Sequence, residues 1–365
     1  MTKILPLNAL HEAAGARFGP FAGYSMPIAY PLGVMKEHLH TRSDAGLFDI
    51  SHMAHIEIEG PEAAALVSGA CPYEAARQQV GTGKYTFMLN EHAGMIDDLI
   101  VSRLSEDKFL IVANGACADK DLAHLREIAA GFDARVRHRP RVFLALQGPT
   151  AEAVLSRRLP SCRDLSFMQV REEGAIFLSR SGYTGEDGFE IALDPADAYQ
   201  FASGLAGEPE VEWIGLGARD SLRMEAGLPL YGQDMDETVD PITAGLSWAV
   251  PKSSRSGGNY IGAKALEALF SDGVGQRRIG LMPDGKAPVR GGAILYDGEN
   301  PDAAEIGVVT SGGFGPSVGH PIALARVLKT ASADTFFADV RGRRLACKPH
   351  KLPFVQHSYK RDENA

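Results

Sequence analysis

The chain has 365 residues, a formal net charge of -9 and a pI of about 5.7. This acidity argues against a general nucleic-acid-binding protein, which needs an excess of Lys and Arg to attract phosphates. Hydrophobic residues make up 45% of the chain and charged residues 23%, as in globular proteins of roughly two or three domains. No apolar stretch is long enough to cross a bilayer, and the N-terminus lacks a signal or transit pattern, so we expect a cytoplasmic protein.

The cysteines and histidines show no metal-binding or disulfide pattern. Cys71, Cys117, Cys162 and Cys347 are widely separated and form no C-x-x-C pair, and the eleven histidines contain no H-E-x-x-H spacing. We therefore predict neither a disulfide framework nor a metal site.

The first 150 residues alternate between helical and strand-like patterns. Gly and Pro interrupt the apolar stretch 18–27, which predicts a loop packed as a wall. Pro61 is suited to the first turn of a helix. The predicted elements, in chain order, are helices 7–17 and 31–46, strand 55–60, helix 61–70, strands 87–89, 96–102 and 109–113, helix 119–131, strand 142–146, and a helix that begins at 148–150.

In the rest of the chain, the pattern of predicted elements changes near residue 276. Strands 175–180 and 189–193 flank a Gly-rich connection, and 217–227 is predicted to be a helix that ends at Gly227. From 276 onward, strand-like pieces such as 278–282 and 306–310 alternate with Gly-rich turns. We therefore predict an α+β region followed by a small β-barrel. The charged tail 360–365 is expected to be frayed.

The most unusual segment is 94–101, which places Asp97 and Asp98 inside an apolar run. Side chains alternate along a strand, so Asp97 would share one face with Leu99 and Asp98 the other face with Ile100. A buried carboxylate must be paired, hydrogen-bonded or protonated, and burial raises its pKa toward values useful for proton transfer. From this segment alone, a chemical role and a structural role, as a turn cap or a partner of Arg, both remain open.

Two further segments are candidates for ligand contacts. In 180–190, three glycines would let the backbone approach a flat ligand, Tyr183 offers a ring face and Glu190 offers two acceptors. A hairpin with a surface Glu is the plainer interpretation. In 217–227, Arg219 and Arg223 lie one helical turn apart and would suit an anion, although salt bridges to Asp220 or Glu225 are commoner. As an isolated residue, Trp248 is expected to be a core anchor.

Taken in order, these segments resemble the glycine cleavage system T-protein, an aminomethyltransferase family, from about Phe18 to Tyr359. Tyr24 and Ala93 depart from the usual Trp and Gly of that family, without removing a proposed functional group. The segments that carry the resemblance are 48–53 (FDISHM), 96–101 (IDDLIV), 182–190 (GYTGEDGFE), 217–220 (GARD), 231–235 (YGQDM) and 245–248 (GLSW).

The resemblance implies a three-domain cloverleaf folate-binding fold of α+β type with a C-terminal β-barrel. It places the folate-binding region at 1–275, as two interleaved subdomains (roughly 1–52 with 140–275, and 53–139), and the barrel at 276–365. The implied substrates are tetrahydrofolate and an aminomethyl group on the lipoyl arm of H-protein, with no nucleic acid or membrane partner. The products are ammonia, 5,10-methylenetetrahydrofolate and the reduced lipoyl arm.

The resemblance also implies roles for individual residues. Asp98 would be catalytic, Glu190 would hold the pterin edge, Tyr183 would lie beside the ring system, and Arg219 and Arg278 would face the glutamate tail. The folate contacts implied by the motifs are Met53, Tyr85, Asn114, Tyr183, Glu190, Arg219, Trp248 and Arg278.

Two other functions use the same scaffold. A tetrahydrofolate-dependent demethylase is disfavoured by the intact Asp98 segment, and a fused flavin dehydrogenase by the absence of a G-x-G-x-x-G motif. Non-catalytic folate-binding proteins of iron–sulfur or RNA-modification pathways carry a Lys-Gly-Cys-Tyr-type segment, whereas 229–234 (PLYGQD) contains no Cys.

Overall fold

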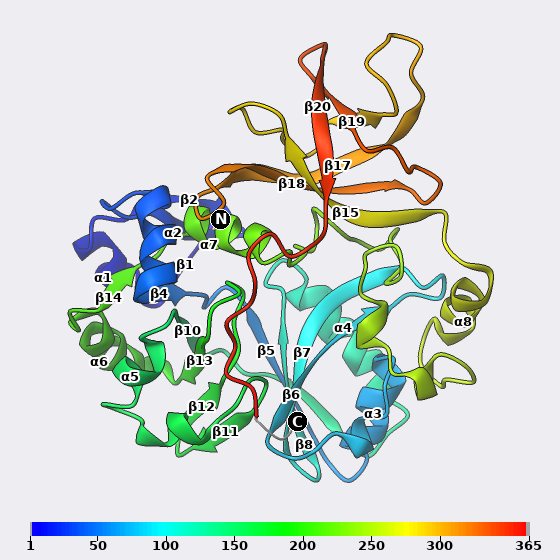
Figure 1. Cartoon of the computed structure of the whole chain (residues 1–365). Helices are drawn as coiled ribbons and strands as arrows, with labels where there is room; N and C mark the ends of the chain where they lie inside the picture. Colours follow the sequence, from blue (N-terminus) through cyan, green and yellow to red (C-terminus); the bar gives the residue numbers. More distant parts are fainter. Residues whose placement is uncertain (1, 363–365) are drawn as a thin grey trace.

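The computed structural model describes residues 2–362, which form three open sheets and one closed barrel. Helices cover the outer faces of the two larger open sheets, and the barrel lies across one end of both (Figure 1). The predicted α+β fold with a C-terminal barrel is confirmed. None of the described helices is both long and apolar enough to cross a membrane.

The larger open sheet has six strands in the order β11-β12-β13-β10-β4-β14. Its central strand, β10, is buried at every position because side chains pack on both of its faces. Only β14 runs parallel to its neighbour. The strands are β4 (Ala45–Asp49), β10 (Val142–Gln147), β11 (Val170–Glu173), β12 (Ile176–Ser179), β13 (Gly188–Leu193) and β14 (Val211–Trp213), and the helices of this half are α1 (Asn8–Ala13), α2 (Val34–Ser43), α5 (Ala151–Leu155), α6 (Pro195–Ala206), α7 (Leu216–Glu225) and the 3-10 helix η2 (Pro160–Asp164).

The second large sheet has five antiparallel strands in the order β6-β7-β8-β5-β9. Its long strand β7 carries both aspartates, with Asp98 opposite Phe87 of β6 and Asp97 opposite Met88. Helices α3 and α4 cover one face. The elements are β5 (Ala54–Glu59), α3 (Ala63–Ala70), η1 (Ala75–Arg77), β6 (Thr82–Leu89), β7 (Met95–Ser105), β8 (Lys108–Ala113), α4 (Ala118–Ala129) and β9 (Arg135–His138).

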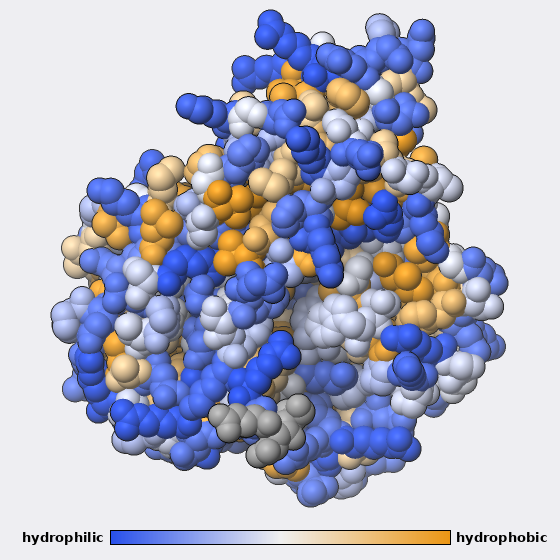
Figure 2. All heavy atoms as spheres, in the orientation of Figure 1, coloured by the Kyte–Doolittle hydropathy of each residue, from blue (hydrophilic) through white to orange (hydrophobic). Residues whose placement is uncertain are grey.

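The barrel closes in the order β15-β18-β17-β16-β19-β20 around an apolar core. Helix α8 and two 3-10 helices connect it to α7. On the face shown in Figure 2, apolar side chains gather where the barrel meets the two large sheets, and the rest of that face is largely hydrophilic. The elements are η3 (Ser247–Ala249), η4 (Lys252–Ser254), α8 (Ala263–Asp272), β15 (Gln276–Pro283), β16 (Ile294–Tyr296), β17 (Glu305–Gly315), β18 (His320–Leu328), β19 (Phe336–Val340) and β20 (Arg343–His350).

The loop predicted over 18–27 is wrong, because this stretch is the hairpin β2 (Arg17–Phe21) and β3 (Tyr24–Ala29). Together with β1 (Lys3–Ile4) it forms a small sheet in which β2 is an edge. An edge strand tolerates Pro20 because no neighbour needs its missing N–H. The helix predicted over 31–46 ends at Ser43, since Ala45 already belongs to buried strand β4.

The chain ends in an irregular segment, residues 351–362, which we call the C-terminal strap. It runs from the barrel down the seam between the two large sheets (Figure 1). Backbone N–H groups of Phe354 and Val355 donate to the carbonyl of Glu225, and that of Ser358 donates to the carbonyl of Gly185. The predicted fraying is wrong for Lys360, which pairs with Glu152 at 2.8 Å and accepts from the backbone N–H of Phe167. It is also wrong for Asp362, which accepts from the Ser166 hydroxyl. Residues 363–365 lie outside the described residues.

Candidate active site

A cavity of about 480 Å³ lies where the two large sheets, the barrel and the C-terminal strap meet. All nine side chains proposed from the sequence line this one cavity, although they are spread along the chain from residue 53 to residue 278. They are Asp98, Met53, Tyr85, Asn114, Tyr183, Glu190, Arg219, Trp248 and Arg278.

Asp98 lies on the wall formed by β7, held by two donors. The Tyr85 hydroxyl donates to Oδ2 at 2.9 Å, and the Asn114 amide donates to Oδ1 at 2.9 Å. The same amide donates to Oδ1 of Asp97 at 2.8 Å, and the Asn114 backbone N–H donates to its Oδ2 at 3.0 Å. Neither aspartate pairs with Arg or Lys among residues 2–362. The structural alternative of an Arg partner is therefore wrong.

The two carboxylates have different surroundings because the strand directs them to opposite faces. Asp97 is 0% exposed and faces α4, whereas Asp98 is partly exposed in the cavity. Burial, followed by the charge of Asp97, raises the pKa of Asp98 to about 7. The hydrogen bonds from Tyr85 and Asn114 oppose this shift. A carboxylate with a pKa near neutrality is suited to proton transfer.

Aromatic rings form the flat walls beside Asp98. Tyr85 stacks on Trp248 with ring centroids 5.5 Å apart and an interplanar angle of 22°. Trp248 is 66% exposed, so the expectation of a core anchor is wrong: the residue lies at the cavity wall rather than in the interior. A flat ligand inserted here would cover its ring.

A second polar group of the cavity lies on β13. Glu190 accepts a hydrogen bond from the Ser181 hydroxyl at 2.8 Å, and burial raises the pKa of its carboxyl. The Tyr183 hydroxyl donates to the Pro229 carbonyl. The guanidinium of Arg219 lies 4.8 Å from the Tyr183 ring centroid and attracts the charge of Glu190. Glu190, Tyr183 and Arg219 therefore belong to one end of the site.

The three glycines of the 182–188 turn have a structural explanation. A Cβ on Gly182 would lie 1.7 Å from Oε1 of Gln147, and one on Gly188 would lie 2.4 Å from the Leu146 carbonyl. Gly185 has a φ of +82°, which disfavours other residues. Close packing against β10 therefore accounts for Gly182 and Gly188, and backbone conformation accounts for Gly185. Gly182 also lines the cavity, so close approach of a ligand at this position stays a prediction.

The two arginines of α7 differ in their partners. Arg223 is 1% exposed and forms ion pairs with Asp234 (2.7 Å) and Asp220 (2.8 Å). Arg219 has no ion pair within the described chain and faces the cavity. Arg278, on barrel strand β15, also lines the cavity, and its buried Nη1 has no hydrogen-bond partner. The salt-bridge alternative therefore holds for Arg223 only.

Several cavity residues were not anticipated from the sequence. Phe21 of the N-terminal hairpin packs edge-on against His52, whose pKa burial lowers to about 3. From the strap, Nε2 of His357 donates to the Ala226 carbonyl at 2.9 Å, and the ring of Tyr359 stacks on that of Phe167 with centroids 4.0 Å apart. The aromatic content of 18–27 was the one sequence signal for this wall. No local sequence pattern predicted that the strap lines the cavity, because its position depends on the barrel that precedes it in the chain.

The site combines flat aromatic walls, a carboxylate acceptor, a carboxylate with a near-neutral pKa, and two guanidiniums that form no ion pair with residues 2–362. Such a set is complementary to a planar heterocycle with a hydrogen-bonding edge and an anionic extension.

Comparison with known proteins gives matches over nearly the whole chain. The GCVT N-terminal domain model matches residues 7–254, and the glycine cleavage T-protein C-terminal barrel domain model matches residues 276–356. An aminomethyltransferase of Xanthomonas oryzae pv. oryzae is 39% identical over 368 residues, covering 98% of this chain and 97% of that protein. A mitochondrial aminomethyltransferase of Dictyostelium discoideum is 35% identical over 379 residues, covering 97% and 93%.

A solved structure shows the same architecture. The crystal structure of glycine cleavage system aminomethyltransferase T from Bartonella henselae has a TM-score of 0.96 and 49% sequence identity, and the match covers 99% of this chain and 100% of that chain. The similarity includes both the sheets and the barrel that enclose the cavity.

Proposed function

Because the chain belongs to the glycine cleavage T-protein family of aminomethyltransferases, we propose that its second substrate is tetrahydrofolate and its partner the lipoylated H-protein. The reaction moves the methylene carbon of an aminomethyl group from the lipoyl arm of H-protein to tetrahydrofolate. It releases ammonia and gives 5,10-methylenetetrahydrofolate and dihydrolipoyl H-protein.

The observation that carries this proposal is the position of Asp98. It lies in the wall of a cavity of about 480 Å³, beside the stacked rings of Tyr85 and Trp248. Burial and the charge of Asp97 raise its pKa to about 7. Folate supplies the nitrogen atoms that accept the carbon, so the protein contributes orientation and electrostatics.

Asp98 has two tasks in this proposal. Ammonia leaves as the carbon–nitrogen bond breaks, and positive charge develops on the carbon that is transferred. The Asp98 carboxylate stabilises that charge across the cavity, where low solvent access strengthens the interaction. The same carboxylate accepts a proton from a folate nitrogen as that nitrogen bonds the carbon. The two new carbon–nitrogen bonds release two protons. One proton goes to the departing amine as ammonia, and the other goes to the lipoyl sulfur as its bond to the carbon breaks. Tyr85 and Asn114 hold the carboxylate in place through both steps.

The remaining residues hold the folate. Glu190 accepts hydrogen bonds from the pterin edge, and Tyr183 and Trp248 lie against the ring system, with Met53 as an apolar neighbour in the same wall. Arg219 is near Glu190, which favours a contact with the same ring edge over the glutamate tail. Arg278, with its unpartnered Nη1, is then the better candidate for the tail carboxylates.

The compartment remains a prediction. Relatives from Dictyostelium discoideum and Pisum sativum are named mitochondrial. The protein must be in the same compartment as its H-protein. The cytoplasmic location expected from the sequence therefore applies where H-protein is cytoplasmic.

The deciding experiment mixes the purified protein with tetrahydrofolate and aminomethyl-loaded H-protein and measures ammonia and methylenetetrahydrofolate. Asp98→Asn should lower turnover by about 10²–10⁴-fold while tetrahydrofolate still binds, because only the charge and proton acceptor are lost. Asp107→Asn, on the exposed turn after β7, is the matched control and should behave as the wild type. Near-normal turnover in Asp98→Asn would refute the role of Asp98, and no product from wild type would refute the proposed reaction.

A further inference from the structure

A cluster of three buried side chains lies behind Asp98, on the face of β7 that packs against α4. Ligand-type atoms of Asp97, Cys117 and Asp121 all lie within 4.8 Å of one another. Asp97 and Asp121 are each 0% exposed, and Cys117 is 5% exposed. The cavity does not include Asp97 or Asp121 in its lining, so the cluster is separate from the surface that meets the folate.

An ionised Asp121 would have no hydrogen-bond donor and no positive ion-pair partner among the described residues. Both of its carboxyl oxygens are buried and have no hydrogen-bond partner among the described residues, and it forms no ion pair with Lys or Arg there. Two facing carboxylates in a low-dielectric interior repel each other, and each needs a donor. One proton placed between Asp97 and Asp121 removes the repulsion and satisfies an oxygen on each side.

The hydrogen bonds indicate which residue carries that proton. Burial raises the pKa of Asp97, but both of its oxygens accept from Asn114, at 2.8 and 3.0 Å, and these donors oppose the rise by favouring the ionised form. Asp121 has no such donors. Burial, followed by the charge of Asp97, raises the pKa of Asp121 to about 9. Asp97 is therefore the anion of the pair, and Asp121 is the acid.

Building on the proposed function, we propose that Asp121 is a positioning residue that stays protonated at neutral pH and donates its proton to Asp97. Asp97 then remains ionised and holds the Asn114 amide, which in turn donates to Asp98. Asp121 thus acts on the reaction through Asp97 and Asn114, without touching either substrate.

The charged and titratable groups around Asp121 are consistent with this assignment. From β7 it faces the charges of Asp97 and Asp98, and from the end of α3 it faces Cys71, whose thiol is neutral because burial raises its pKa to about 12. On its own helix, Cys117 is neutral for the same reason. Lys120 partly offsets the negative charge but is engaged by Glu237 at 2.6 Å. The protonated state of Asp121 limits the buried negative charge to Asp97.

The first test compares two variants of nearly equal size. Asp121→Leu removes the donor, so Asp97 takes up a proton, Asn114 loses its fixed orientation and kcat falls by about 10² with little change in KM. In a plot of kcat/KM against pH, the rising part on the acid side (the acid limb) also moves to lower pH. The reason is that Asp98 no longer faces an ionised neighbour, so its pKa falls. Asp121→Asn, which keeps a donor and no charge, should restore both kcat and the wild-type limb. If Asp121→Asn instead shifts the limb to lower pH, Asp121 is ionised in the native protein and the proposal is overturned.

The second test does not depend on activity and is done in the Asp98→Asn background. At about pH 8, the infrared spectrum of labelled aspartates should contain a protonated carboxyl band that disappears in Asp98→Asn/Asp121→Asn. Absence of that band overturns the proposal, whatever the kinetic result of the first test. Elemental analysis provides a further check, because a stoichiometric divalent ion that is lost with Asp121→Asn would mean that the cluster holds a metal instead of a proton.

Discussion

Asp97 and Asp98 are adjacent in the chain yet have different chemical surroundings. Alternation along β7 directs Asp97 into the interior, where Asn114 donates to both of its oxygens, and directs Asp98 into the cavity. The charge of the first raises the pKa of the second. The pair resembles other sites in which two carboxylates are given distinct roles by their environments alone.

The pH dependence of kcat/KM follows from the pKa of Asp98. Asp98 must be ionised to stabilise positive charge, so kcat/KM should rise about tenfold per pH unit below its pKa of about 7 and level off above it. Asp97→Asn removes the neighbouring charge and should lower the pKa of Asp98, which moves the acid limb to lower pH. A profile that is flat from about pH 5 to 8 would contradict the assigned role.

Helix α7 shows how one element distributes two similar side chains. Arg223 faces the interior, where it joins Asp220 and Asp234 and also donates to the Ser311 hydroxyl of β17 at 2.8 Å. Arg219, one turn earlier, lies over the Tyr183 ring in the cavity. The helix therefore contributes one guanidinium to the connection with the barrel and the other to the cavity.

Substituting the two arginines should separate stability from binding. Arg223→Ala leaves Asp234, which is 3% exposed, without its buried partner and should destabilise the fold by about 3–5 kcal/mol in denaturant unfolding. Arg219→Ala should change unfolding by at most about 1 kcal/mol. It should weaken tetrahydrofolate binding by about 1.5–3 kcal/mol in calorimetry, the worth of a charged hydrogen bond. Unchanged affinity in Arg219→Ala would remove it from the folate site.

The turn before β7 contains two positions at which backbone conformation or close packing favours Gly. Ala93 has a φ of +65°, a region that favours Gly, and a Cβ on Gly94 would lie 1.8 Å from the Glu237 carbonyl. Both positions therefore favour Gly, which explains the usual Gly of the family at the position where this chain has Ala93. The Ala at 93 costs roughly 1–2 kcal/mol of backbone strain in this chain.

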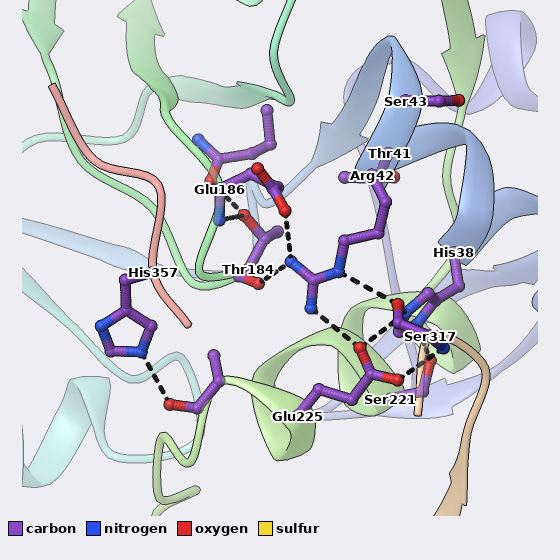
Figure 3. A network of polar contacts seen from close by, with 12 residues as sticks. His38, Thr41, Arg42, Ser43, Thr184, Glu186, Ser221, Glu225, Ser317 and His357 are labelled. Carbon is purple, nitrogen blue, oxygen red and sulfur yellow. Dashed lines mark hydrogen bonds and ion pairs between the residues drawn. The ribbon is translucent and has the colours of Figure 1, made fainter. Parts of the chain in front are cut away.

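At the scale of the whole molecule, one carboxylate joins the parts that enclose the cavity. Glu225, at the end of α7, accepts from Arg42 and His38 of α2 at 3.0 Å and from the backbone N–H of Ser317, in the turn before β18, at 2.7 Å (Figure 3). Arg42 also donates to Glu186 at 2.9 Å and to the Thr184 carbonyl at 2.8 Å. The same network therefore contacts the six-stranded sheet, α7 and the barrel.

Removing the charge of Glu225 should lower the free energy of unfolding of the protein. Burial by itself would raise the pKa of Glu225, but His38, Ser317 and Arg42 lower it to about 2. Glu225→Gln should cost about 3–5 kcal/mol near neutral pH. The difference from wild type should shrink as the pH falls from about 4.5 through about 2, because the wild-type carboxylate becomes protonated.

The control for this substitution is Glu74→Gln. Glu74 pairs with Arg77 at the surface, where the two side chains are 45% and 76% exposed, so its loss should cost about 0–1 kcal/mol. Equal effects of the two substitutions in urea unfolding would contradict the idea that Glu225 links the parts of the molecule.

The amino-acid pattern was sufficient where the signal is local or where a resemblance supplies the spacing. Alternation identified β5, short apolar runs indicated β7, β8 and β10, and Gly-rich turns indicated the barrel from residue 276 onward. The hairpin over residues 17–29 was missed, because its Gly and Pro residues are as typical of loops as of edge strands. Trp248 was misjudged, because exposure is a property of the packed molecule and leaves no trace in a single residue.

By itself, the sequence determined the fold class, the pair of aspartates as the unusual feature, and through its motifs the family and the nine candidate residues. Only the tertiary structure decided that these nine line one cavity, that Arg219 rather than Arg223 faces it, and that the C-terminal strap closes its side. It also decided that Asp121 lies beside Asp97. The physical reason is that periodicity records which way a side chain points within its own element, whereas burial, pKa and ion pairing depend on neighbours that arrive from distant parts of the chain.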